Sequence, residues 1–124
     1  MARNIISQQA GKPYSRGTTV GNMIFVSGQL GIDDDEKEIP GGVGPQMRQC
    51  LTYVKEILAQ IKATLDDVVM INIYMADLGN DYDEMNEVYR EFFGKENLPA
   101  RATVEVSRLA MDLKVEVSCI ACLS

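Results

Sequence analysis

Residues 68–76, with the sequence VVMINIYMA, constrain the fold more than any other stretch of the chain. The run is rich in β-branched side chains and largely apolar at both its odd and its even positions, which predicts a strand. Successive side chains of a strand point to opposite faces of a sheet, so apolar residues on both faces need cover on both. We therefore expect a central strand with a packed layer on each side.

Two amphipathic helices are expected to supply part of that cover. From residue 45 to 62 apolar side chains recur at spacings of three and four, and a second such stripe runs from Asn80 or Asp81 to Phe93, with Gly94 near its end. If both helices cover one face of the sheet, its other face must meet another subunit. This arrangement favours a closed homo-oligomer over a monomer.

The remaining strands are predicted from β-prone runs that turn residues separate. Near the N-terminus, Ile5 and Ile6 indicate an edge strand, and residues 18–20 and 23–28 indicate a hairpin closed by Gly21-Asn22. Toward the C-terminus, two further β-prone runs indicate a terminal strand pair that we expect to form a second hairpin, at residues 103–106 and 114–123. The whole order predicts one α+β domain over residues 1–124 with a mixed sheet.

The composition excludes several kinds of chemistry. A formal net charge of −6 without a basic cluster disfavours nucleic acid as a partner, because phosphate binding needs a concentrated basic surface. The chain contains no histidine, which removes a Ser-His triad, an imidazole base and a histidine metal site. Any catalysis must come from Arg, carboxylate, Tyr, Ser, Cys or backbone groups.

Neither a membrane span nor a metal site is expected. No run approaches the ~18 apolar residues of a span and no signal-peptide segment is present, so we expect a soluble, cytoplasmic protein. The acidic run at 33–38 lacks an EF-hand ligand pattern and predicts a solvated loop. Cys119 and Cys122 form a C-x-x-C within a predicted strand, where they point to opposite faces, so we expect buried apolar cysteines rather than a redox pair.

Two residues are candidates for ligand contact from the local pattern. Arg101 follows the rigid turn at Pro99 and lies at the start of a predicted strand. There it either presents its planar fork to a carboxylate or is a surface arginine that caps a sheet edge or pairs with a neighbouring acid. Gly28 either allows a ligand to approach the backbone closely or simply ends a strand. The local pattern leaves these alternatives open.

An ordered set of short motifs spans nearly the whole chain: Pro13-Tyr14-Ser15, Val20-Gly21-Asn22-Met23-Ile24, Ser27-Gly28-Gln29, Asn86-Glu87-Val88-Tyr89, Phe92-Phe93, Pro99-Ala100-Arg101, Val104-Glu105-Val106-Ser107-Arg108-Leu109 and Val115-Glu116-Val117. In this order and spacing the chain resembles the RidA/YjgF family of reactive-intermediate imine deaminases. The resemblance implies a chorismate-mutase-like fold and a homotrimer with a barrel-like centre and ligand clefts between subunits. It also implies hydrolysis of 2-imino acids, such as 2-iminobutanoate and 2-iminopropanoate, to 2-keto acids and ammonia, with no cofactor.

The resemblance also assigns roles to individual residues. Arg101 matches the arginine that binds the substrate carboxylate, and Glu116 matches the acid that positions or activates water. Further cleft positions match Tyr14, Ser27, Gly28, Asn86 and Thr103. Because the expected terminal hairpin places Glu116 opposite residues 105–106 rather than Arg101, we expect the pair to come from neighbouring subunits.

Some residues depart from the family pattern. Lys12 and Arg16 add positive charge near the expected cleft, and Ala110 stands where relatives usually have proline. These departures bear on substrate preference more than on the fold. The alternatives to a deaminase are a non-catalytic module that binds a keto or amino acid through Arg101 and, less favoured by the charge, a ribonuclease or translation inhibitor.

Overall fold

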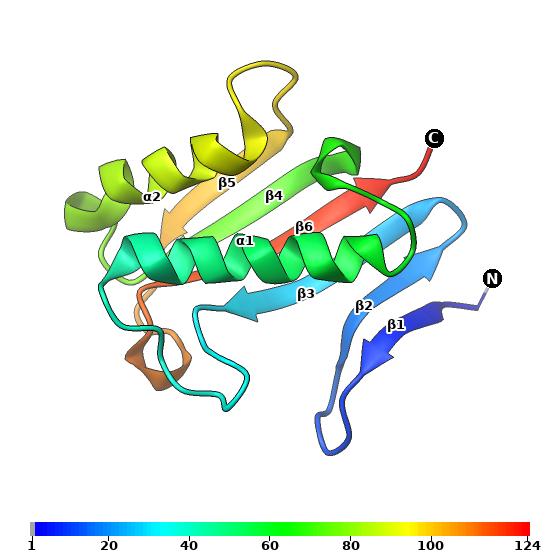
Figure 1. Ribbon diagram of the computed structural model, residues 1–124, viewed down its shortest axis with the longest axis horizontal. Helices are drawn as coiled ribbons and strands as arrows, with labels where there is room; N and C mark the ends of the chain where they lie inside the picture. Colours follow the sequence, from blue (N-terminus) through cyan, green and yellow to red (C-terminus); the bar gives the residue numbers. More distant parts are fainter. Residues whose placement is uncertain (1) are drawn as a thin grey trace.

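A six-stranded mixed sheet carries two helices on one face in the computed structural model, which describes residues 2–124 (Figure 1). The strands follow one another across the sheet in the order β1-β2-β3-β6-β4-β5, and only the β4–β5 pair is parallel. The elements are β1 (Asn4–Gln8), β2 (Ser15–Val20), β3 (Met23–Leu30), α1 (Val43–Ala59), β4 (Val68–Met75), α2 (Leu78–Phe93), β5 (Ala100–Glu105) and β6 (Val115–Cys122). Single 3₁₀ turns lie at Leu65–Asp67 and Ala110–Asp112.

The α+β class, the mixed sheet, both helices and the edge strand β1 are confirmed. The expected first hairpin is also present, with β2 and β3 paired antiparallel around Gly21, whose φ of 58° lies in the left-handed region. Helix α2 begins two residues earlier than the first start considered, because the Asp77 side chain caps it by accepting the Asn80 N–H. Neither helix of residues 2–124 is long and apolar enough to cross a membrane.

The expected terminal hairpin is wrong. Strand β5 pairs with β4 at the edge of the sheet, whereas β6 is inserted between β3 and β4. The physical reason is burial: alternate residues of β6 are fully or almost fully buried under the helices, as in a central strand, whereas β5 has no buried residue. The chain crosses from one position to the other through residues 106–114.

One face of the sheet forms the core with the helices and the other is open. On the helix side Ile71, Ile73, Val115 and Val117 pack against the apolar stripe of α1, including Leu51. The open face carries a row of paired residues, which the register places side by side across five strands: Ile5, Thr18, Phe25, Ile120 and Met70. Of these, Ile5 and Phe25 remain 53% and 41% exposed. The second layer expected over the central strand is therefore absent from a single chain.

A buried glutamine ties the start of β6 to the first helix. The Gln46 side chain is fully buried, accepts the backbone N–H of Lys114 at 2.8 Å through Oε1 and donates to Glu38 at 2.9 Å through Nε2. Gly31 leaves room for it, since a Cβ there would lie 2.5 Å from the Gln46 Cβ. This contact holds the chain just before the residues of β6 that reach the candidate site.

We expect Gln46→Leu to lower the free energy of unfolding by about 1–3 kcal/mol, because the Lys114 N–H would lose its acceptor. Urea unfolding followed by circular dichroism measures the change. Gln60→Leu, at an exposed position just past α1, is the control and should leave the midpoint almost unchanged. Equal stability of the two variants would contradict the role assigned to Gln46.

Candidate functional site

Arg101 lies near the start of β5, on the helix side of the sheet. Its strand partner is the buried Ile71, and paired residues share a face. The guanidinium lies over the ring of Tyr89 from α2, with Cζ 4.7 Å from the ring centroid, and Nε donates to Thr103 Oγ1 at 2.7 Å. A longer hydrogen bond of 3.3 Å reaches the Tyr82 hydroxyl. The guanidinium of Arg101 is thus oriented by the aromatic face of Tyr89 and the hydroxyl of Thr103.

No acidic side chain among residues 2–124 forms an ion pair with Arg101. Its hydrogen-bond acceptors are neutral hydroxyl oxygens, so no residue in the described part of the chain neutralises its charge. The alternative of a surface arginine that pairs with a neighbouring acid is therefore not what the single chain shows. An oriented and unpaired guanidinium is suited to bind a carboxylate.

A cavity of about 410 Å³ opens beside the guanidinium. Arg101 lines it together with Tyr82, Tyr89 and Asn86 of α2, and with Leu98, which precedes the Pro99 turn. Asn86 lies beside the apolar stripe of α2 and is only 8% exposed, so this polar side chain forms part of the cavity wall and is not solvated at the surface. Burial raises the pKa of Tyr89, and the neighbouring Arg101 offsets part of that rise. Tyr89 therefore keeps its proton at neutral pH.

Glu116 lies on the open face of the sheet, opposite to the face that carries Arg101. Its neighbours in β6, Val115 and Val117, are buried in the core, and its strand partners are Leu30 and Tyr74. Burial raises the pKa of the carboxyl group above its ordinary value. Like Arg101, Glu116 has no ion-pair partner in the part of the chain that the structure describes.

Gly28 provides the space for this carboxylate. A Cβ at Gly28 would lie 2.3 Å from Glu116 Oε2, so the carboxylate rests directly against the glycine backbone. The register between β3 and β6 shifts between Val26 and Gln29, which makes Ser27 and Gly28 a β-bulge. Gly28 therefore lies within β3, so the interpretation that it ends the strand is wrong. The group that closely approaches its backbone is the Glu116 carboxylate, and the approach of a ligand stays a prediction.

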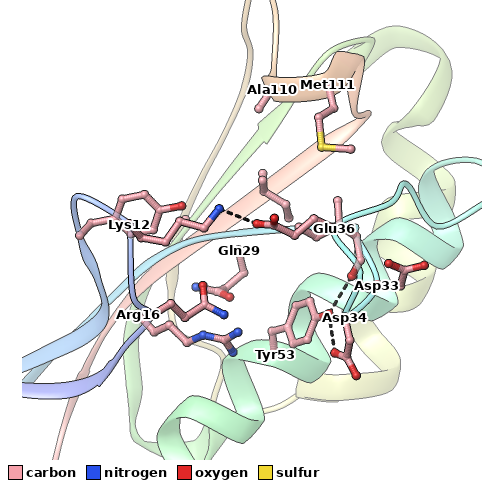
Figure 2. A pocket seen from close by; sticks show the side chains of 14 residues that line it. Lys12, Arg16, Gln29, Asp33, Asp34, Glu36, Tyr53, Ala110 and Met111 are labelled. Carbon is pink, nitrogen blue, oxygen red and sulfur yellow. Dashed lines mark hydrogen bonds and ion pairs between the residues drawn. The ribbon is translucent and has the colours of Figure 1, made fainter.

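Ser27 and Tyr14 lie near the same bulge. The Ser27 hydroxyl donates to the backbone oxygen of Ser15 at 2.6 Å, which holds β2 against the bulge. Tyr14 is 52% exposed and lines a second cavity of about 700 Å³ together with Gly28. Figure 2 shows this cavity: Lys12 and Glu36 form an ion pair across it.

The sequence-predicted residues thus form two separate groups. Arg101, Thr103 and Asn86 lie together on the helix side, whereas Gly28, Glu116 and Ser27 lie at the bulge and Tyr14 lines the second cavity beside Gly28. We call them the arginine cluster and the glutamate cluster. A single chain does not bring them together.

Sequence reasoning missed the role of two tyrosines. Tyr82 was not singled out, and Tyr89 was named only within a family motif and given no role, yet both contact the guanidinium. The available signal was the spacing of Tyr82, Asn86 and Tyr89, which lie four and three residues apart on one face of a helix. That spacing shows a shared face, but it does not show that the face meets β5.

The expectation of buried apolar cysteines is confirmed for Cys119 but not for Cys122. Cys50 and Cys119 are buried, Cys122 is half-buried, and all three are free. Burial raises the pKa of Cys119 to about 12 and that of Cys50 further still. Both thiols therefore stay protonated and unreactive at neutral pH.

The fold defines a class of small α+β proteins with a mixed six-stranded sheet, two helices on one face and polar clusters at both faces. A family model described as endoribonuclease L-PSP matches residues 5–123, and the chain belongs to this family, which includes the RidA/YjgF proteins.

Several relatives show how far the similarity extends. A RutC family protein of Pyrococcus abyssi is 45% identical over 126 residues, with 98% of each chain covered. The 2-iminobutanoate/2-iminopropanoate deaminase of Escherichia coli K12 is 40% identical over 111 residues, covering 88% of this chain and 86% of that one. The crystal structure of E. coli TdcF with bound serine superposes with a TM-score of 0.87 at 35% identity, covering 98% of this chain and 99% of that one.

We expect Gly28→Ala to displace the Glu116 carboxylate, because the new methyl group would occupy its place. Since the clash is with the end of a flexible side chain, the fold should persist while the Glu116 pKa falls toward its ordinary value. Carboxyl carbon NMR during a pH titration measures this shift. Gly79→Ala is the control, since a Cβ at Gly79 meets nothing within 4 Å. An unchanged Glu116 pKa in Gly28→Ala would contradict the contact.

Proposed function

We propose that the protein is a hydrolytic deaminase of 2-imino acids such as 2-iminobutanoate and 2-iminopropanoate, releasing a 2-keto acid and ammonia without a cofactor. The observation that carries the proposal is a pair of complementary groups, Arg101 and Glu116, neither of which has an ion-pair partner among residues 2–124. The name of the E. coli deaminase that is 40% identical supports the same activity.

The complete site lies between subunits of a homotrimer. Arg101 and Glu116 face opposite sides of the sheet, so one chain supplies the arginine cluster and its neighbour supplies the glutamate cluster. The apolar row on the open face, with Phe25 and Ile5 exposed, gives the neighbour a surface to bury. The terminal hairpin that was expected to keep Arg101 and Glu116 apart within one chain is absent, but their positions on opposite faces of the sheet favour the same shared site.

Within this site Arg101 binds the substrate carboxylate through charge-assisted hydrogen bonds. Thr103 and Tyr89 hold the guanidinium in place, and Asn86 lines the wall on which the rest of the substrate rests. Tyr14 and Ser27 flank the position of the reacting carbon from the neighbouring chain. Together these contacts from the two chains fix the imine carbon of the substrate beside Glu116.

Glu116 then acts on water. Its carboxylate, desolvated against Gly28, accepts a proton from a water molecule as the oxygen adds to the imine carbon. The protonated Glu116 returns that proton to the nitrogen, which leaves a hydroxyl and an amino group on one carbon. Glu116 then accepts the hydroxyl proton and passes it to the amino nitrogen as the carbon–nitrogen bond breaks, so that the keto group and ammonia form together. One water is consumed, and one 2-keto acid and one ammonia are produced.

We expect Arg101→Ala to lower kcat/KM about 100-fold or more, because a two-pronged carboxylate contact is lost. Glu116→Gln should lower kcat by about 10²–10⁴-fold, as expected for loss of a general base. The wild-type rate should fall on the acid side as Glu116 is protonated, with a midpoint above its ordinary value of 4.5, and this limb should vanish in Glu116→Gln. The assay generates the imine with a dehydratase or amino-acid oxidase and follows its loss.

The same assay separates the deaminase from the alternatives. If the folded wild type binds 2-oxobutanoate in calorimetry but does not accelerate imine loss, the protein is a carboxylate-binding module; the serine-bound structure of TdcF is the observation that favours this second candidate. RNA cleavage that survives Arg101→Ala and repurification would instead support a ribonuclease. Either result contradicts the proposed deaminase.

Mixing two inactive variants tests whether the site is shared. When Arg101→Ala and Glu116→Ala chains exchange subunits in equal amounts, each site has one chance in two of receiving an intact Arg101 and one in two of receiving an intact Glu116. Activity should therefore recover to about a quarter of the wild-type value. No recovery, with subunit exchange verified by mass spectrometry, would place both residues in one chain's site.

A further inference from the structure

The cavity beside Arg101 contains more positive charge than one carboxylate needs. Besides Arg101 it is lined by Arg90 and Lys95, and no aspartate or glutamate lines it. The chain as a whole has 18 acidic and 12 basic residues, so a group of three cations with no acid among them is opposite in sign to the net charge of the chain. Neither Arg90 nor Lys95 forms an ion pair within residues 2–124.

Local structure explains how these cations come together. Asn86 and Arg90 lie one helical turn apart on α2, and Tyr82 lies one turn before them, so the three share a face. Lys95 follows Gly94, whose φ of 76° turns the chain out of the helix and back toward β5. The turn returns the chain to Arg101, so that helix end, loop and strand start surround one cavity.

Arg90 also has a structural explanation, because a cation in the last turn of a helix stabilises the helix dipole. That explanation does not account for Lys95 or for the lack of an acid among the residues that line the cavity. Three cations of residues 2–124, Lys12, Arg48 and Arg108, form ion pairs, and the remaining cations outside the cavity do not. The cavity is therefore distinguished by the gathering of three cations with no carboxylate among its lining residues, and not by the lack of ion pairs alone.

We propose that this cavity binds a second anionic group of the substrate, so that the preferred substrates are 2-imino acids with a carboxylate on the side chain. This inference rests on the proposed deaminase function and names its substrate class. Arg101 holds the carboxylate next to the imine carbon, and Arg90 with Lys95 holds the distal carboxylate. Substrates with apolar side chains leave these two cations to solvent and gain nothing from them.

The test compares two substrates of different charge, 2-iminoglutarate and 2-iminobutanoate, each released in the assay by an amino-acid oxidase or dehydratase. The wild type should have the higher kcat/KM for 2-iminoglutarate. The double variant Arg90→Gln/Lys95→Gln should lower the ratio of the two kcat/KM values about tenfold, as expected for lost charge-assisted contacts. Lys62→Gln is the matched control, because Lys62 is exposed just beyond α1 and does not line this cavity.

A binding measurement makes the inference independent of turnover. In calorimetry 2-oxoglutarate should bind the wild type more tightly than 2-oxobutanoate, and the double variant should lose that difference whereas Lys62→Gln retains it. A purely structural role of Arg90 would lower the melting temperature and leave the difference in place, which would overturn the inference. So would a preference for 2-iminobutanoate in an active enzyme. The absence of turnover with either substrate would refute the deaminase function alone, because the binding comparison still decides the charge preference.

Discussion

Residues that pair across a sheet share a face, and this constraint separates the two charged groups on which the proposed chemistry depends. Arg101 is paired with Ile71 and lies under α2, whereas Glu116 follows buried Val115 and must project from the opposite face. No side-chain rotation brings one through the sheet to the other. Each group is instead supported by its own surroundings: Tyr89 and Thr103 for the guanidinium, and Gly28 for the carboxylate.

The insertion of β6 between β3 and β4 determines where the arginine cluster and the glutamate cluster lie. It puts Glu116 beside the end of β3, where the bulge lies, and leaves β5 at the edge, where Arg101 has open space on its outer side. A terminal hairpin would have brought β6 to the edge and moved Glu116 away from Gly28. The glutamate cluster therefore depends on a crossing made by residues 106–114, held at its end by the Gln46 contact with Lys114.

The parts of the fold that sequence reasoning predicted are those with a local signal. The helices follow from apolar spacing, and the first hairpin follows from Gly21-Asn22 between two β-prone runs. The position of β6 was missed because the choice of a strand's neighbours depends on burial over the whole sheet, which adjacent sequence does not show. Of the site residues, Arg101 was a candidate from its position after the Pro99 turn, whereas Glu116 was assigned through the family resemblance. The contact between Glu116 and Gly28 depends on a register shift that no local pattern reveals.

The bulge at Ser27 and Gly28 makes β3 one residue longer than regular pairing with β6 requires. Val26 and Gln29 both face the helices although three positions separate them, where a regular strand needs two. A chain shorter by one residue here would keep every later side chain of β3 on its present face and would pair more regularly with β6. The hydrophobic core gains nothing from the additional residue. The additional residue instead sets where the Glu116 carboxylate lies, because it brings Gly28 rather than a residue with a side chain against that carboxylate.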